Sequence, residues 1–302
     1  MCIRASYSLT GKVPVMHVTA ITCRKDAVLA ATIVGLPPME DGHLGEAIGQ
    51  QFSPVLNFQH RDVKSVHLPM ETGFHNLAIV ASKQRYPRQG RKTALGLLGA
   101  GQMMFLKTII AVDENHDPTD LEALLDALNS KVDIATDLLV LDGMVAYSLE
   151  AASPYENVHS KLIIDATTLA ERDPRSDAGP LEGSYAQPTP EWRQGKGEAP
   201  GFSGLEDVLK LEHVADARML RDSIMVVTTH IENSPTLQDG QSESNDDAEA
   251  SRRERIYQLR KSIWQLDNLS SLRWLFITND DLDLNCEKAH RRLLLQLTSR
   301  FD

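Results

Sequence analysis

The strongest constraint on the fold of this chain is a strand–helix–strand alternation in its first half. Ile109–Val112 is an apolar run of strand length, and Pro118 and Asp120 open the segment that follows it. Leucines in that segment recur at the spacing of a single helix face, at Leu121, Leu124, Leu125 and Leu128. A strand followed by an amphipathic helix is typical of a sheet that is covered by helices.

The same alternation continues on both sides of this unit. Strand patterns lie at 63–68, 77–81 and 138–141, and helical patterns lie at 44–56 and 93–98. Pro54 is expected to kink or shorten the helix at 44–56, because proline has no backbone N–H donor. We therefore predict an α/β fold, a layered mixed sheet with flanking helices.

The N-terminal segment carries two apolar runs on either side of a polar turn. Val13–Thr22 is rich in β-branched residues, Arg24–Asp26 is polar, and Ala27–Val34 is apolar again. This pattern predicts a β-hairpin. Pro37 and Pro38 are expected to end it, since proline cannot donate to a strand ladder.

Composition excludes several classes of protein. A net charge of -11 argues against a nucleic-acid partner, because a polyanion would repel the chain. No apolar run approaches the ~20 residues of a membrane span, and no secretory signal is recognisable. The three cysteines lie far apart, at Cys2, Cys23 and Cys286. They fit reduced thiols in the cytoplasm and do not form a zinc site.

Composition also divides the chain into parts. The first domain is expected at 1–170, and the Pro-, Gly- and acid-rich stretch at 171–203 reads as a linker or surface arm. A second, smaller α/β unit is expected at 204–302. It is interrupted at 232–254 by a segment that is too polar to bury and is therefore predicted to be disordered.

The second unit resembles part of the first. Residues 274–283 parallel 108–117, with an acidic turn after each strand, and 222–230 parallel 75–83. The matching order of elements favours an internal repeat. The alternative is that any two strand–helix units look alike at this level.

Candidate sites for chemistry are few. The glycines of Gly99–Met104 follow a helix and precede a strand, so they suit a helix C-terminus and not a dinucleotide loop. The acidic turns at 113–117 and 280–283 could ligate a hard cation, but helix capping is favoured because neither matches a calcium loop. Lys107 precedes an apolar strand, where it either snorkels to solvent, the default, or meets an anion.

Several strings carry a family resemblance, and they occur in family order: His17–Thr22, Ala31–Asp41, Phe74–Val80, Arg85–Pro87, Gly101–Lys107, Ser153–Pro154 and Ser160–Thr167. Together they resemble the C-terminal domain of the UbiD family over residues 7–168. These proteins are decarboxylases of aromatic and unsaturated acids that use prenylated FMN. Cys23 replaces a frequent family histidine and Ala27 a frequent proline, which a turn tolerates.

The resemblance implies that the catalytic half of the family lies outside this chain. Family members bind prenylated FMN, Mn²⁺ and K⁺ in a central domain, whose residues should precede His17 in this chain. The segment Cys2–Ser8 keeps at most the last two residues of that central domain, Tyr7 and Ser8. We therefore expect no catalytic residue, no metal ligand and no cofactor on this chain alone. The cofactor acts as an electron sink in such enzymes.

The resemblance also implies a contribution to the substrate side of the pocket. The matching positions are His17, Ile21, Met104, Phe105 and Lys107. A plain core or edge role is the alternative for each of them.

Two hypotheses for function follow. In the first, the chain is the C-terminal portion of a UbiD-type carboxy-lyase of the quinone-biosynthesis type, inactive without a flavin-binding portion supplied elsewhere. In the second, it is a non-catalytic module that keeps the family's oligomer or partner contacts. Family members assemble through this domain, so we expect a homo-oligomer.

Overall fold

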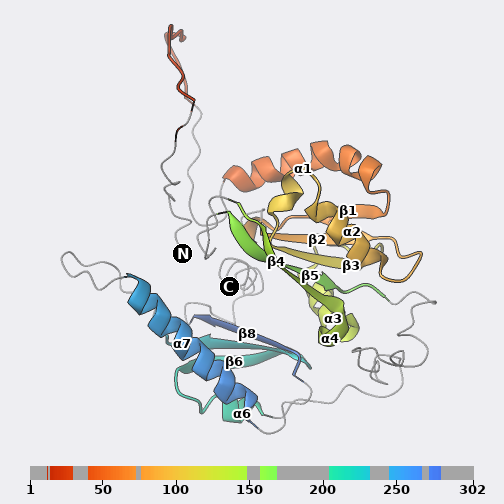
Figure 1. Ribbon diagram of the computed structural model, residues 1–302, viewed down its shortest axis with the longest axis vertical. Coiled ribbons are helices and arrows are strands. Elements are labelled where there is room, and N and C mark those ends of the chain that lie inside the picture. Colours follow the sequence, from red (N-terminus) through yellow and green to blue (C-terminus); the bar gives the residue numbers. More distant parts are fainter. Residues whose placement is uncertain are drawn as a thin grey trace, which may run out of the picture.

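The computed structural model describes residues 12, 14–29, 40–72, 76–147, 157–168, 204–231, 245–266 and 272–279. Within these ranges it contains a five-stranded sheet and a three-stranded sheet (Figure 1). Helices cover the faces of both sheets, so the predicted α/β class with a layered mixed sheet is confirmed.

The five-stranded sheet is built from β1 (Val63–His67), β2 (Leu77–Ser82), β3 (Thr108–Asp113), β4 (Leu138–Val145) and β5 (Val158–Asp165). Its strand order is β1-β2-β3-β5-β4. The central strands β2, β3 and β5 run parallel, and β1 and β4 pair antiparallel at the two edges. Mixed sheets with antiparallel edge strands are common among α/β folds.

The sheet is covered on both faces, which explains why every residue of β2 is buried. Ala78 and Val80 point to one face, where they pack with Leu97 of α2 (Gln89–Leu98). Leu77, Ile79 and Ala81 point to the other face, where they pack with α3 (Leu121–Lys131). A strand with two buried faces is apolar at every position, and for that reason it lacks the alternation of a half-exposed strand.

The remaining helical elements of the first unit are α1 (Glu40–Gln59), η1 (Met70–Thr72), η2 (Gly101–Phe105) and α4 (Ile134–Asp137). The helix predicted at 44–56 is therefore confirmed and is longer than expected. Pro54 lies inside α1 and does not end it.

The second unit contains α6 (Leu205–Val208), β6 (Val214–Arg221), β7 (Ile224–Thr229), α7 (Asn245–Trp264) and β8 (Trp274–Asn279). The strand order is β6-β7-β8, with β6 antiparallel and β8 parallel to β7. Leu259 and Ile263 of α7 pack on one face of this sheet. The sequence predicts disorder at 232–254, but residues 245–254 belong to α7, so that part of the prediction is wrong.

The segment β1–β2–α2–β3 and the segment β6–β7–α7–β8 have the same order and strand directions. The registers also agree: Leu77 at the start of β2 pairs with Thr108 at the start of β3, and Ile224 pairs with Trp274. The two strand matches seen in the sequence therefore fall on equivalent strands.

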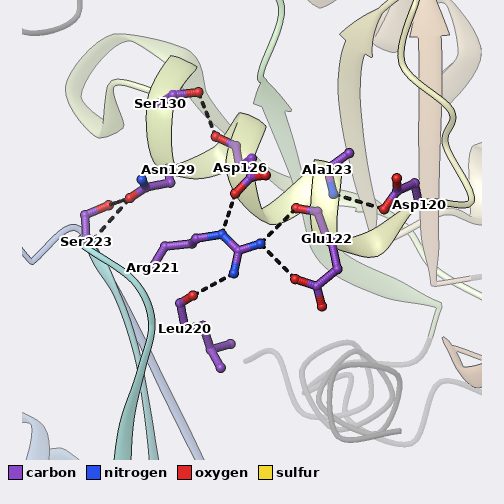
Figure 2. Close-up of polar contacts among 9 residues, drawn as sticks. All are labelled: Asp120, Glu122, Ala123, Asp126, Asn129, Ser130, Leu220, Arg221 and Ser223. Carbon is purple, nitrogen blue, oxygen red and sulfur yellow. Dashed lines mark hydrogen bonds and ion pairs between the residues drawn. The ribbon is translucent and has the colours of Figure 1, made fainter. Parts of the chain in front are cut away.

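The second unit docks on α3 through side chains near the turn between β6 and β7, as Figure 2 shows. The guanidinium of Arg221 donates to the carboxylates of Glu122 and Asp126. The hydroxyl of Ser223 donates to Oδ1 of Asn129 at 2.6 Å. Beneath these contacts Ile224 belongs to the same apolar cluster as α3.

The hairpin predicted from Val13–Thr22 and Ala27–Val34 is not formed in the described part of those ranges. Residues 14–24 and 27–29 have no regular structure, although Lys25 and Asp26 form the expected turn. The arm (residues 14–29) extends away from both sheets, where it is drawn in red in Figure 1. Neither of the two described sheets includes the arm, and an isolated hairpin has too little buried apolar surface to be stable.

Candidate functional site

The candidate site lies where η2 meets the amino ends of β3 and β5. At the C-terminus of α2 the N–H of Gly99 donates to the carbonyl of Gly96 and that of Ala100 donates to the carbonyl of Leu97, which confirms the predicted helix C-terminus. Gly101 then adopts φ +50°, a left-handed conformation that disfavours other residues. These two glycines turn the chain from α2 into η2 and then into β3.

Lys161 of β5 reaches across to η2. Its Nζ atom donates to the carbonyl oxygen of Met104 at 2.7 Å and to that of Leu106 at 2.6 Å. The third contact of Nζ is with Nε2 of His159, at 3.3 Å. An ammonium group has three N–H donors, so these three acceptors satisfy Lys161 completely. The residue is only 1% exposed, and this hydrogen bonding offsets the cost of burying its charge.

The electrostatics of this pair follow from burial. Burial lowers the pKa of the Lys161 ammonium to about 8. Burial, together with the positive charges of Lys161 and Lys107, lowers the pKa of His159 to about 4. His159 is therefore neutral at pH 7. Because its Nε2 accepts from Lys161, its proton is on Nδ1. Nδ1 is buried and makes no hydrogen bond.

Lys107 enters the same cluster from the residue before β3. Its backbone N–H donates to Asn76, and its carbonyl accepts from Leu162 at 2.9 Å, so the main chain is fixed between β2 and β5. The side chain is only 4% exposed. The default expectation that Lys107 snorkels to solvent is therefore wrong, because the neighbouring strands enclose it on both sides.

The structure brings three of the five predicted pocket residues together. Met104 and Phe105 lie in η2 and Lys107 lies just after it. The Phe105 ring meets the Tyr147 ring edge-on, with 5.5 Å between the centroids. His17 and Ile21 lie instead on the exposed arm, in a separate part of the molecule (Figure 1).

Sequence reasoning missed Lys161, His159 and Tyr147. The available signal was the alternation of two basic residues in β5, His159 and Lys161, which places both side chains on one face of the strand. Pairing of Thr108 with Leu162 then sets Lys107 beside Lys161 across the sheet.

The first acidic turn, 113–117, precedes α3 but does not supply its N-cap, which is Asp120 just beyond the turn. The carboxylate of Asp120 accepts from the N–H of Ala123 at the start of α3, and that of Asp117 accepts from Thr119. Burial acts to raise the pKa of Asp113, but hydrogen bonds from Lys131 and Thr168 outweigh it and hold that pKa below its usual value. The second turn, at 280–283, lies outside the described residues.

The described residues contain no group of three or more His, Cys, Asp or Glu side chains that could hold a metal ion. Among the same residues, no helix has both the length and the apolar character needed to cross a membrane.

Residues 42–166 match the family described as the 3-octaprenyl-4-hydroxybenzoate carboxy-lyase C-terminal domain. An uncharacterized protein of Archaeoglobus fulgidus is 39% identical over 154 residues, which cover 51% of this chain and 32% of the relative. An uncharacterized protein of Aquifex aeolicus is 41% identical over 162 residues, covering 54% of this chain and 33% of the relative. Residues 42–166 of this chain are therefore a UbiD C-terminal domain. The chain spans about a third of the length of these relatives.

Two solved structures are also similar. The vanillic acid decarboxylase of Sedimentibacter hydroxybenzoicus, in its open form, is 27% identical with a TM-score of 0.44, covering 49% of this chain and 32% of that chain. The UbiD-class enzyme HmfF of Pelotomaculum thermopropionicum, in complex with FMN, is 18% identical with a TM-score of 0.38, covering 46% and 30%.

Proposed function

We propose that this chain supplies the C-terminal portion of a UbiD-type carboxy-lyase, which removes CO₂ without oxidation from an aromatic or unsaturated acid. The observation that carries the proposal is the UbiD C-terminal domain at 42–166. The family description names a polyprenyl hydroxybenzoate, and this supports a substrate of the quinone-biosynthesis type. A flavin-binding portion, from an upstream segment or a separate chain, completes the enzyme in this proposal.

The exposed apolar side chains of the arm support the proposal that a flavin-binding portion completes the enzyme. Val15, Met16, Val18 and Ile21 are 66–85% exposed, and Val28 and Leu29 are 94% and 89% exposed. Contiguous apolar side chains in water are typical of a surface that another protein segment covers. In the proposed enzyme the flavin-binding portion covers the arm, and this places His17 and Ile21 at its pocket.

Met104 and Phe105 form the second part of the proposed pocket surface, and Lys107 lies buried just after them in the chain. Met104 is 36% exposed and is therefore accessible to a substrate beside the half-buried Phe105 ring. An apolar surface with a cation close by suits an aromatic acid, because the ring and the carboxylate need different partners.

The family's cofactors belong to the other portion in this proposal. Mn²⁺ requires several oxygen or nitrogen ligands, and the described residues contain no suitable group of side chains. No chemical step is therefore assigned to residues of this chain. Prenylated FMN supplies the electron sink for decarboxylation when it is bound.

The test is reconstitution. The reading frame upstream of Met1 is sequenced, and any flavin-binding portion found there is expressed with and without this chain. Flavin absorbance and CO₂ release from 4-hydroxybenzoate-type acids are measured with prenylated FMN, Mn²⁺ and K⁺. We expect activity only when both portions are present. Stoichiometric flavin binding by this chain alone would contradict the proposal, and stable assembly without any activity would favour the non-catalytic module.

We propose three further properties of this chain. A homo-oligomer is expected by analogy with the family. A cytoplasmic location is expected from the separated cysteines. Finally, we propose that the second unit is a duplicate of β1–β2–α2–β3, supported by the shared strand order, directions and register.

A further inference from the structure

We propose that Lys161 is a positioning residue: its ammonium group holds the η2 turn on β5 and so sets where Met104 and Phe105 lie. This inference rests on the proposed function only where it assigns Met104 and Phe105 of η2 to a substrate pocket. The hydrogen bonds that carry it are present in the folded chain itself.

The η2 turn needs such an anchor because it is poorly buried. None of the five residues Gly101–Phe105 is fully buried. Its backbone is closed by short-range bonds, from Met103 N–H to the carbonyl of Ala100 and from Leu106 N–H to that of Met103. Such bonds shape a turn without fixing its place on the sheet. The two bonds from Lys161 join η2 to a strand 55 and 57 residues further along the chain.

His159 completes the anchor. Its Nε2 atom accepts the third N–H of Lys161, which orients the ammonium toward the two carbonyls. The pairing Leu141 with Lys161 and Met144 with His159 places an edge strand beside both residues. The anchor is therefore enclosed by β4, β5 and η2 and is shielded from water.

The charges around Lys161 are few. His159 on β5 and Lys107 before β3 are the basic groups of the cluster, and η2 carries no titratable side chain. On β4, Asp142 is exposed and accepts from Ser160, whose side chain points to the opposite face from Lys161. Burial lowers the pKa of Lys161 to about 8.

Deprotonation changes the anchor in a defined way. A neutral amine has two N–H donors and one lone pair, whereas the ammonium has three donors. One of the three acceptors must therefore lose its donor as the pH rises through the pKa of Lys161. The environment of Met104, whose carbonyl is one of those acceptors, should change over the same pH range.

The test uses the full chain with ¹³C-labelled methionine methyl groups, followed by NMR from pH 6 to pH 10. The Met104 signal is assigned with Met104→Leu. We expect it to shift with a midpoint near pH 8, the value to which the Lys161 pKa is lowered. The Met16 methyl on the exposed arm is the internal control and should not shift with that midpoint.

Lys161→Met supplies the decisive comparison, because it keeps an unbranched side chain that is one atom shorter and removes the titrating group. We expect the pH-dependent Met104 shift to disappear in this variant. A wild-type Met104 signal that does not change between pH 6 and 10 would overturn the proposal, and so would a titration that persists in Lys161→Met. The wild-type experiment needs no variant to fold, and none of these signals depends on decarboxylation. Failure here is therefore distinct from failure of the proposed function.

Discussion

Nη2 of Arg221 lies 2.8 Å from Oε2 of Glu122, and this contact joins the second sheet to a helix of the first unit (Figure 2). The same guanidinium donates to Asp126, one helical turn further along α3. A single side chain of β6 therefore forms ion pairs with two carboxylates of α3. Because Glu122 and Asp126 are half exposed, water and salt weaken both contacts.

Replacement of Arg221 by Met should loosen the docking of the two units. Loss of both ion pairs is expected to lower the free energy of unfolding by about 1 kcal/mol, since exposed pairs contribute little individually. Urea unfolding at low salt and at high salt measures the effect, which should be smaller at high salt. Lys210→Met is the matched control, because the Lys210–Asp207 pair lies on the surface of the second unit. Equal losses in the two variants would refute a special role for Arg221.

Gly90 of α2 should not tolerate a side chain. A Cβ atom there would lie 2.8 Å from Cγ2 of Thr167 and 2.9 Å from Oδ1 of Asp165, so Gly90→Ala forces α2 away from β5. Such overpacking costs about 1–3 kcal/mol. Thermal unfolding provides the measurement. Gly99→Ala is the control, because its nearest neighbour would be the carbonyl oxygen of Gly96 at 3.6 Å. If both variants unfold at the wild-type temperature, the close approach of α2 to β5 is not as described.

The stability of the chain should fall in mild acid because of His159. The folded state keeps this imidazole neutral down to about pH 4, whereas an unfolded histidine takes up its proton near pH 6.5. The stability contribution is thus fully present above pH 6.5 and is lost as the pH falls toward 4. The expected loss between pH 7 and pH 4.5 is about 2 kcal/mol.

Urea unfolding at these two pH values, in wild type and in His159→Gln, isolates the contribution of His159. The free energy of unfolding should fall less between pH 7 and pH 4.5 in the variant than in wild type, and the two losses should differ by the contribution of His159. His43→Gln provides the control, because His43 is exposed on α1. An identical pH dependence in wild type and His159→Gln would show that other groups cause the acid loss.

The N-cap of α3 provides a simpler test. Asp120 accepts a hydrogen bond from the N–H of Ala123 at 3.0 Å, and Asp120→Ala removes this acceptor. The expected cost is about 1 kcal/mol of unfolding free energy. Asp120→Asn keeps an acceptor oxygen and should remain close to wild type, as judged by denaturant unfolding. Loss of equal size in Asn and Ala variants would assign the effect to charge and not to capping.

The individual strands and helices around the central sheet could be predicted from the sequence because each depends on local signals. β2 and β3 are apolar runs of strand length, and the leucine stripe of α3 has one clear periodicity. The N-terminal arm has equally strong β-branched content, yet it forms no strand among the described residues. Strand propensity reflects packing against neighbours, and no described strand lies beside the arm.

The candidate site was only partly predictable. Met104, Phe105 and Lys107 are consecutive or nearly so, and their proximity follows from the sequence alone. Lys161 joins them from 55 residues away because β5 pairs with both β3 and β4. That neighbourhood depends on strand order, which short-range patterns do not encode.

The end of α3 ties the two units together in a further way. Arg273, just before β8, donates to the carbonyls of Asn129 and Val132, and the indole of Trp274 donates to that of Leu128. Helices usually cap such carbonyls with their own following residues. Here a later part of the chain does so. Removal of the second unit would therefore leave these carbonyls of the first unit without their donors.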